Sequence, residues 1–286
     1  MSRALPLRVF AGLFLLGGLW LAYNQSQPTG PVLKIEKIRG DLYVIAMAQG
    51  VGGGNVAVLV TNEGVILVDD MFDRNHDEIL EKVKSITSLP VKYVLNSHQH
   101  DDHAGGNAKM MAQGSEVIGH QRLRANMMAL NQPGAPRITF TKEMSVFLGG
   151  QEVRMLYFGR GHTGGDAIIY FPSLKVIHTG DLFLTNPPQP FIDYAQGGSA
   201  AEWTDTLDQA LKLDFDVAIP GHGPVSDRQG IMKFESNFVT MRNRIQGLVR
   251  GGASKDEVAN TLVNDFHWAK GGLAVQQVDA FITEMK

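Results

Sequence analysis

Residues 97–103 read Ser-His-Gln-His-Asp-Asp-His, which places three histidines and two aspartates side by side in a chain with nine histidines. Neutral imidazoles and carboxylates are the ligands that Zn²⁺ and related divalent metals prefer in proteins. The chain has no cysteine, so metal ligands must be nitrogen and oxygen atoms, and disulfides are excluded. The run also follows a short apolar stretch at 91–95. A strand that ends in metal ligands predicts a catalytic metal site.

Three later segments share one layout, in which a short apolar strand runs into a glycine and then a ligand-type residue. They are Gly161-His162-Thr163, Gly180-Asp181 and Gly221-His222-Gly223. Glycine lets the chain turn sharply at a strand end and lets the backbone approach a metal closely. Because strands of one sheet system can end at the same edge, we expect these segments and residues 97–103 to meet in one cleft.

The run from His98 to His103 resembles the HxHxDH motif of the metallo-β-lactamase superfamily. The three glycine-containing segments resemble the next three motifs of that family, in the same order, and Val68-Asp69 resembles its first motif. The resemblance covers about residues 33–230. It implies an α+β fold, a four-layer αββα sandwich of two mixed sheets flanked by helices, with two metals at one edge.

The resemblance also implies the ligands of each metal. The first metal would be held by His98, His100 and His162, the second by Asp102, His103 and His222, and both by a bridging Asp181. Seven ligands exceed what one tetrahedral zinc accepts, which favours two metals sharing a carboxylate and a water. Two Zn²⁺ are therefore the expected cofactors, and iron or manganese stays open because both accept histidine and carboxylate.

The remaining polar residues near the motifs receive other roles. Asp102 is expected to be catalytic, by accepting a hydrogen bond from the attacking hydroxide and orienting it. Asp69 is expected to hydrogen-bond a ligand imidazole without binding metal, and the alternative is an ordinary turn at a strand end. We expect the histidines outside the ligand set to be structural or exposed; they are His76, His120, His178 and His267.

The expected function is that of an exported dinuclear zinc hydrolase that uses a metal-bridging hydroxide on a β-lactam, lactone, ester or thioester. Asp181 favours thioesterase and lactonase relatives, because many β-lactamases of the family carry Cys or Ser there, whereas export favours a β-lactamase. The alternatives are a glyoxalase II type thioesterase without β-lactamase activity, an iron-dependent oxidative enzyme on the same fold, and a non-catalytic binding protein. The expected partner is a small-molecule substrate. A net charge of −3 without a basic face disfavours nucleic acid, and oligomeric state is not indicated.

The elements that position these residues are short strands rich in Val, Ile and Leu. The expected strands are 33–38, 42–47, 55–61, 65–69, 91–96 and 116–118, then 145–148, 151–158, 167–171, 175–178 and 217–219. Helices are expected at 75–85, 106–113, 121–130, 200–213, from 231 onward, and at 274–285, and Ser254 to Glu257 predicts a capping box. Hairpin turns between strands favour a sandwich of two sheets over a doubly wound parallel sheet.

The two ends of the chain differ from its centre. Arg3 and Arg8 accompany an apolar run at 9–23, as in a secretory signal, and an uncleaved anchor is the alternative. We expect a signal peptide or anchor with a linker at 1–30, a catalytic domain at 31–230, and a helical extension packed on it at 231–286. The protein is expected to be periplasmic or secreted, or attached to the inner membrane, with membrane contact only through an uncleaved N-terminal segment.

Two loops are candidates for substrate contact. The glycine-rich segment 49–54 lies between two expected strands and is either a flap over the site or an ordinary hairpin. Residues 185–194 contain too many prolines for a helix or a central strand. Phe191, Ile192 and Tyr194 in this loop either form an apolar wall for substrate or pack onto the body of the protein.

Overall fold

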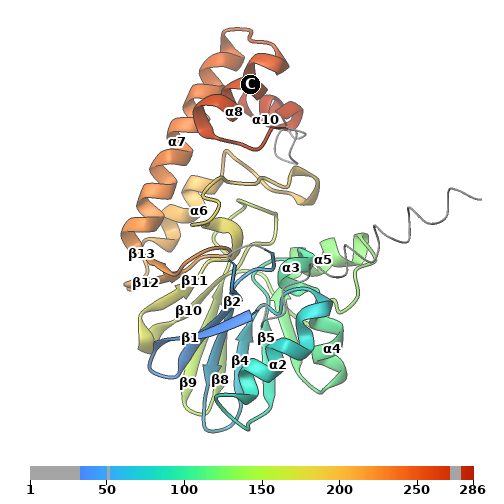
Figure 1. The fold of residues 1–286 in the computed structure, drawn as a ribbon. Coiled ribbons are helices and arrows are strands. Elements are labelled where there is room, and N and C mark those ends of the chain that lie inside the picture. The colour runs from blue at the N-terminus through green and yellow to red at the C-terminus, as the bar shows by residue number, and fades with distance from the viewer. Residues whose placement is uncertain (1–32, 50–51, 271–277) are drawn as a thin grey trace, which may run out of the picture. The chain divides into compact units, whose positions relative to one another are not determined.

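Two mixed β-sheets face each other in the computed structural model, which describes residues 33–49, 52–270 and 278–286 (Figure 1). Residues 33–286 belong to one compact unit. The predicted signal peptide or anchor lies outside the described residues, as do residues 50–51 of the glycine-rich segment and the start of the last predicted helix. Within the described ranges, no helix combines the length and the apolar character needed to cross a membrane.

The first sheet follows chain order from β1 to β7. Its strands are β1 (Leu33–Arg39), β2 (Leu42–Met47), β3 (Val56–Val60), β4 (Val65–Val68), β5 (Val91–Leu95), β6 (Glu116–His120) and β7 (Ile138–Phe140). Strands β1 to β4 form the predicted antiparallel meander, and β4 to β7 run parallel. The change from antiparallel to parallel pairing makes the sheet mixed.

The second sheet has the order β13-β12-β11-β10-β9-β8. Its strands are β8 (Glu143–Leu148), β9 (Gln151–Leu156), β10 (Ile168–Phe171), β11 (Val176–His178), β12 (Val217–Ile219) and β13 (Ser226–Asp227). The predicted hairpins β8–β9 and β10–β11 are both present, and Gly149 and Gly150 turn the first with φ of 53° and 76°. Positive φ at both turn residues is what a tight hairpin requires, and glycine meets it without steric cost.

Helices cover the outer faces of both sheets. Next to the first sheet lie α2 (His76–Lys84), α4 (Asn107–Ala112) and α5 (Gln121–Ala129), and next to the second lie α6 (Trp203–Ala210) and α7 (Arg228–Arg250). The remaining helices are α3 (Asp101–Ala104), α8 (Lys255–Phe266) and α10 (Val278–Met285), the last two packed on α7. Helix, sheet, sheet and helix layers confirm the predicted αββα sandwich.

Burial on both faces explains why the strands are apolar without alternation. In β3, Val56 and Val58 join the core under α2 and α4, whereas Ala57 and Leu59 join the core between the sheets. The second sheet repeats this division, because Ile168 faces α6 and α7 and Ile169 faces the other sheet. Successive side chains point to opposite faces, so each strand serves two cores.

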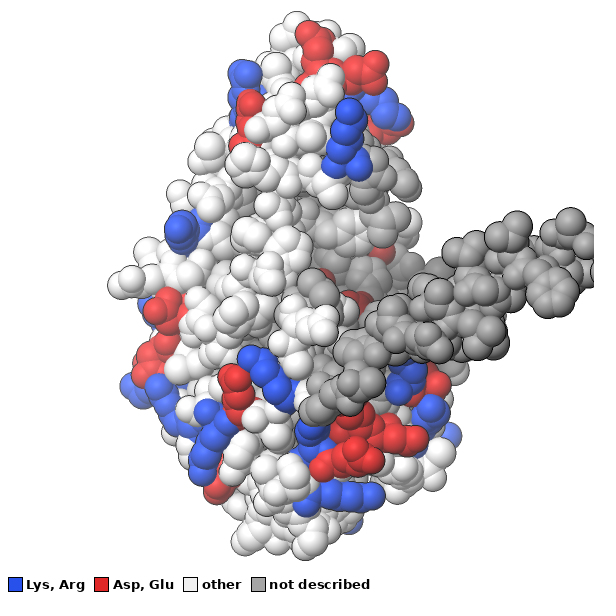
Figure 2. Space-filling view, viewed as in Figure 1, with Lys and Arg blue, Asp and Glu red and all other residues white. Residues whose placement is uncertain are grey.

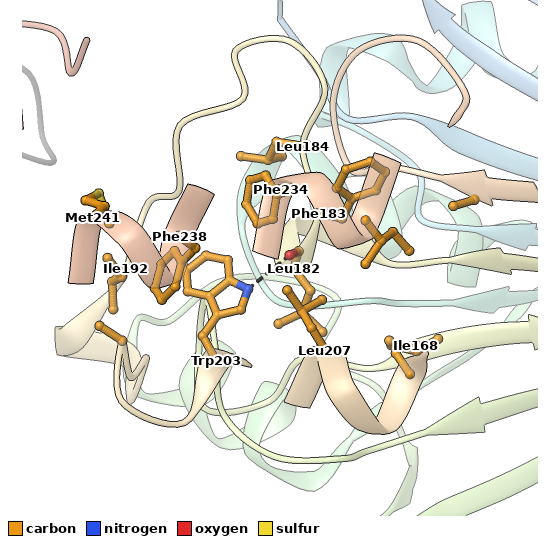
Figure 3. Packing of buried hydrophobic residues seen from close by; sticks show 14 of the residues in the cluster. Ile168, Leu182, Phe183, Leu184, Ile192, Trp203, Leu207, Phe234, Phe238 and Met241 are labelled. Atoms are coloured by element: carbon orange, nitrogen blue, oxygen red, sulfur yellow. Dashed lines mark hydrogen bonds between the residues drawn. The ribbon is translucent and has the colours of Figure 1, made fainter. Parts of the chain in front are cut away.

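The core outside the second sheet is built around Trp203 (Figure 3). The indole is fully buried beside Leu207 and Phe238, and its Nε1 donates a hydrogen bond to the carbonyl oxygen of Leu182 at 3.0 Å. This bond satisfies the one polar group of a large apolar side chain. Because Leu182 directly follows Asp181, the core also fixes a loop that carries a predicted metal ligand.

Several elements differ from the sequence prediction. The helix expected at 200–213 is shorter, since α6 ends at Ala210, and α7 begins at Arg228 rather than at residue 231. The capping box between Ser254 and Glu257 is present at the start of α8. Strands β7 and β13 were not predicted, because runs of three and two residues carry no readable alternation.

On the face shown in Figure 2, Lys and Arg side chains lie among Asp and Glu side chains. Exposed ion pairs include Lys34 with Glu36 at 2.8 Å and Lys109 with Asp73 at 3.0 Å. Such pairs contribute little stability individually because both partners remain solvated. The fold is therefore held mainly by its buried layers.

Candidate metal centre

The predicted ligand residues follow the ends of four strands. The run from His98 to His103 follows β5, His162 follows β9, Asp181 follows β11 and His222 follows β12. Strand β4 runs parallel to β5, and β11 runs parallel to β12, so the carboxyl ends within each pair share one edge of their sheet. The structure brings all seven predicted ligands together there.

The ligand-type atoms fall into three groups whose members lie within 4.8 Å of one another. The first ligand set is His98, His100 and His162, and the second ligand set is Asp102, His103 and His222. A third group, of His98, His103 and Asp181, joins the two sets. The grouping matches the predicted division of the cluster into two halves, with Asp181 between them.

The two halves of the run at 98–103 lie in different local structure. His98 and His100 lie in the connection between β5 and α3, whereas Asp102 and His103 lie on α3, a helix of one turn. The backbone N–H of Asp70 donates to the carbonyl oxygen of His103 at 2.8 Å and fixes α3 to the turn after β4. The sequence prediction ended the ordered segment at a strand and missed α3, because four residues show no helical period.

The first ligand set consists of imidazoles held from outside by other polar groups. His100 donates from Nε2 to the Asp193 carboxylate at 2.9 Å, and His162 donates from Nδ1 to the carbonyl oxygen of Phe191 at 2.6 Å. These bonds leave His100 Nδ1 and His162 Nε2 as acceptors, and the two atoms lie 2.9 Å apart. Two facing lone pairs repel unless a cation or a proton lies beside them.

Burial disfavours a positive charge on two members of this set. It lowers the pKa of His162 to about 4. Burial, together with neighbouring His103 and His162, lowers the pKa of His98 well below its usual value. Desolvation disfavours the charged imidazolium when carboxylates do not compensate it fully. The rings of His98 and His162 can therefore bind metal without first losing a proton.

The second ligand set is charged. His222 Nε2 lies 3.2 Å from Asp102 Oδ2 and 3.4 Å from Asp181 Oδ1. Burial opposes the charge, but Asp181 and Asp102 raise the pKa of His222 to about 9. The same two carboxylates raise the pKa of His103 well above its usual value, again against burial. The positive charge on these imidazoles balances the negative charge of the two carboxylates. A bound cation would take over that role.

Asp181 connects both sets. Its Oδ1 lies 3.1 Å from His103 Nε2, and its Oδ2 lies 3.7 Å from His162 Nε2. Burial would raise the pKa of Asp181, but His222 and His103 lower it well below the usual value. The carboxylate is thus ionised and offers one oxygen to each side.

Asp69 holds the cluster from behind. It is fully buried, its Oδ2 accepts from His103 Nδ1 at 2.8 Å, and it also accepts from the backbone N–H and the hydroxyl of Ser97 at 2.7 and 2.6 Å. Ser97 Oγ lies 3.0 Å from His98 Nδ1. Asp69 has φ of 62°, a left-handed conformation that aspartate tolerates better than most residues. The carboxylate therefore orients the imidazole of His103 directly and that of His98 through Ser97, which is the kind of contact expected for Asp69.

Two observations indicate that the donor set fits divalent cations. The buried atom His98 Nε2 has no hydrogen-bond partner in the described part of the chain, although buried polar atoms are normally satisfied. Glycines leave room beside the cluster: a Cβ at Gly221 would lie 2.0 Å from Asp181 Oδ1, and one at Gly54 would lie 2.2 Å from His103 Cε1. The nitrogen and oxygen donors suit zinc, without excluding iron or manganese.

The other predicted residues have varied positions. His178 is buried beside the cluster but donates from Nε2 to the carbonyl oxygen of Asn55 at 3.0 Å, so its ring is engaged elsewhere. His76 and His120 are buried away from the ligand groups, and His267 is exposed. His120 stacks on Tyr157 with ring centroids 4.0 Å apart. All four histidines thus lie outside the metal groups.

The proline-rich loop has a mixed outcome. Ile192 is buried in the core with Trp203, and Tyr194 packs against the same core, so both take the packing alternative. The Phe191 ring lies against the first ligand set, with centroids 6.2 Å from His100 and 5.6 Å from His162. Phe191 alone of the three retains a place beside the candidate site.

Two contacts to the ligands were not predicted from the sequence. The Asp193 carboxylate and the Phe191 carbonyl oxygen orient His100 and His162 from the far side of the rings. A carboxylate in the loop after Asp181 was a visible signal that could have suggested Asp193. The Phe191 carbonyl has no such signal, because every residue carries one.

A pocket of about 280 Å³ borders the second ligand set. Its walls include Val44, Ala46, Val225, Asn186 and Lys34, and His222 forms one end. Apolar walls with a few polar groups beside reactive residues are typical of small-molecule sites. The structure thus combines a two-sheet sandwich with a paired His/Asp cluster at one edge, and the residues of that cluster could hold metal ions.

Residues 49–222 match the family model of the metallo-beta-lactamase superfamily, and the chain belongs to that superfamily. A metallo-beta-lactamase type 2 from Elizabethkingia meningoseptica is 26% identical over 223 residues, covering 73% of this chain and 85% of that protein. The 2,4-dinitroanisole O-demethylase subunit alpha of Nocardioides sp. (strain JS1661) is 25% identical over 217 residues, covering 73% and 62%. A metallo-beta-lactamase structure from Pontibacter korlensis has a TM-score of 0.64 and 23% identity over 72% of this chain and 98% of that one, which shows the fold.

Proposed function

We propose that the chain is an exported dinuclear zinc hydrolase that cleaves a carbonyl-containing bond of a small molecule. The observation that carries the proposal is the shared position of Asp181, 3.1 Å from His103 Nε2 and 3.7 Å from His162 Nε2. A carboxylate with one oxygen toward each set suits two neighbouring cations better than one. Two sets of three ligand-type residues, with Asp181 between them, also support two metal ions.

Two zinc ions bound at these sets would supply a hydroxide at neutral pH and polarise a carbonyl oxygen. Asp102 is ionised, because His103 and His222 lower its pKa although burial opposes them. Its carboxylate is partly exposed, with Oδ2 3.2 Å from His222 Nε2. Asp102 is therefore placed to accept a hydrogen bond from the attacking oxygen and orient it toward the carbonyl carbon.

The pocket beside His222 supports a substrate with a modest apolar group. Val44, Ala46 and Val225 provide apolar contact, whereas Lys34 and Asn186 offer polar groups at the same pocket. We propose β-lactams as the first substrate class to test, since β-lactamases are among the relatives of this chain. Lactones, esters and thioesters share the reacting carbonyl group.

Asp181 favours a second candidate function. A bridging aspartate, rather than Cys or Ser, is the residue expected of thioesterase and lactonase relatives. A glyoxalase II type thioesterase without β-lactamase activity is therefore the alternative, and an iron-dependent oxidative enzyme is a third outcome decided by metal identity. The Arg3 and Arg8 start followed by an apolar run supports export to the periplasm or beyond.

The test combines metal analysis with a substrate panel. Purified full-length protein should contain about two zinc ions per chain and hydrolyse at least one of a cephalosporin, a penicillin, a homoserine lactone and a thioester. 2,4-Dinitroanisole belongs in the panel because one relative is named for that substrate. Asp102→Ala should lose about 10²- to 10⁴-fold in turnover, the range for a lost proton-handling group.

Asp101→Ala is the matched control, because Asp101 is the neighbouring aspartate of the same motif and is exposed to solvent. It should retain activity. A wild-type protein without transition metal, or an Asp102→Ala variant as active as Asp101→Ala, would contradict the proposal. Iron in excess of zinc, in protein made with both available, would favour the oxidative alternative.

A further inference from the structure

The loop at residues 191–200 touches two of the three members of the first ligand set. Asp193 accepts from His100, and the Phe191 carbonyl oxygen accepts from His162. Each bond fixes the tilt of a ring and places its proton on the outer nitrogen, which leaves the inner nitrogen free. The position of this loop therefore determines where the inner nitrogens of His100 and His162 point.

The loop is joined to the segment that carries His162. Asp193 N–H donates to the carbonyl oxygen of His162 at 2.8 Å, and Ser199 N–H donates to that of Gly161 at 2.9 Å. Gly198 lies so close that a Cβ there would be 2.5 Å from the His162 carbonyl oxygen. A displacement of the loop would consequently disturb His100 and His162, two of the three members of the first ligand set.

The opposite side of the loop is held by one carboxylate from the C-terminal helix. Glu284 of α10 accepts hydrogen bonds from Tyr194 Oη at 2.8 Å, from Ala200 N–H at 2.9 Å and from the Ser199 hydroxyl. Ser199 and Ala200 are fully buried. Three donors separated from Glu284 by 84 to 90 residues thus converge on a single side chain.

Helix α10 is itself firmly placed. Val278, Phe281 and Met285 are buried in the core that α7 and α8 share with the second sheet, and the Phe281 ring stacks near Trp268. The exposed side chain of Asp279 forms an ion pair with Lys255 of α8. The helix lies beyond residue 222, where the family-model match ends. It therefore adds a contact that the matched region does not contain.

We infer that Glu284 is a positioning residue for the first metal: through the loop at 191–200, α10 orients His100 and His162 and raises the affinity of the first ligand set. The inference rests on the proposed binding of zinc at that set. Linkage makes the effect reciprocal, so metal bound at the first ligand set stabilises the docking of α10. The C-terminal extension is then part of the metal site rather than only a cover for the sheet.

The test uses the full-length chain stripped of metal and titrated with Zn²⁺ against a chromophoric chelator. Glu284→Ala should weaken zinc binding at the first ligand set (the first binding event) by about 2- to 30-fold, the range for coupling through packed contacts. Zinc binding at the second ligand set (the second binding event) should be unchanged within error. Glu284→Gln should bind like wild type, because its amide oxygen can accept from Tyr194 and Ala200 and its amide nitrogen can donate to the Ser199 hydroxyl. Asp279→Ala is the matched control: it removes a carboxylate of the same helix that pairs with Lys255 of α8 instead of accepting hydrogen bonds from the loop.

A second readout follows from reciprocity. Hydrogen exchange of α10 amides should slow when Zn²⁺ is added to the wild type and to Asp279→Ala, and should not respond in Glu284→Ala. If Glu284→Ala fails to fold, Tyr194→Phe provides a milder test, because it removes a single hydrogen bond to Glu284. It should also weaken zinc binding at the first ligand set.

Equal zinc affinities in wild type, Tyr194→Phe and Glu284→Ala would overturn the inference while leaving the proposed function intact. Equal losses in Glu284→Ala and Asp279→Ala would also overturn it, since they would indicate general loosening of α10. A wild type that binds no zinc would overturn both proposals.

Discussion

The two halves of the candidate metal centre differ in the charge that their side chains carry. The first ligand set consists of three imidazoles, and burial lowers the pKa of two of them, His98 and His162; a carbonyl oxygen, a hydroxyl and the Asp193 carboxylate orient the rings. The second ligand set, together with the neighbouring Asp181, is an ion-pair network of two imidazoles with raised pKa values and two ionised carboxylates. The first half is prepared to accept a cation directly, whereas the second must exchange protons for one.

This difference in charge suggests how two cations could be accommodated close together at one edge of a sandwich. A second neutral set would leave the added positive charge uncompensated, and a second acidic set would repel itself without metal. The combination places Asp102 and Asp181 beside His103 and His222, so the cluster is balanced by protons when metal is absent. The loops that orient each half also differ, with Asp69 behind the second set and Asp193 behind the first.

Asp181→Ala is expected to have the largest effect, because it removes the group that both halves share. Zinc affinity should fall at both binding events by more than about 100-fold, the upper end for residues outside the ligand set. Competition with a chelator measures both events. Asp166→Asn is the control, since Asp166 is a buried carboxylate that bonds Thr163 instead. Loss at one event alone would break the assignment of Asp181 to both halves.

Asp69→Asn and Asp193→Asn should separate the halves. Each should cost about 10- to 100-fold in zinc affinity, Asp69→Asn mainly at the second event and Asp193→Asn at the first. Asparagine tolerates the left-handed backbone at position 69, so the fold is retained. The contact from Ser97 to His98 predicts a smaller secondary loss at the first event for Asp69→Asn. Indistinguishable profiles for the two variants would contradict the division.

The pH dependence of zinc uptake should also distinguish the halves. His222 has its pKa raised to about 9, so below that pH metal must displace its proton. Below that pH, affinity at the second event should therefore rise with pH by about tenfold per unit for each imidazole proton displaced, and His103, whose pKa is also raised, adds a second proton. His162, with a pKa of about 4, and His98, with a pKa well below its usual value, carry no proton near neutral pH, so the slope at the first event should be smaller. Titrations at several pH values measure both slopes, and equal slopes would contradict the contrast.

The smallest effect is expected for Phe191→Ala. The ring lies beside His100 and His162, but the bond to His162 comes from the backbone carbonyl, which the substitution retains. Zinc affinity at the first event should change by less than about threefold, as for most substitutions that remove no buried polar contact. A loss as large as that of Asp193→Asn would show that the ring, rather than the carbonyl, orients the ligand.

The sequence predicted the sandwich and the meeting of the candidate ligand residues at one edge, because both depend on local patterns. Apolar strands that end in glycine and a ligand-type residue mark the edge where His162, Asp181 and His222 lie. The contacts that orient the ligands depend instead on tertiary structure: the bond from His100 to Asp193 spans 93 residues. The three hydrogen bonds to Glu284 also depend on tertiary structure. From the sequence alone, an acidic residue on a short amphipathic helix is expected to be exposed to solvent.

Zinc stoichiometry distinguishes a cluster that forms two sites meeting at Asp181 from a cluster that forms one. The third group of His98, His103 and Asp181 offers the competing arrangement, a single ion in the middle of the cluster. Metal-free wild type, His162→Ala and His222→Ala should each be titrated with Zn²⁺ and analysed for bound metal. The two-site account predicts about two ions for the wild type and about one for each variant. One ion in all three proteins would contradict it, because neither His162 nor His222 belongs to the central group.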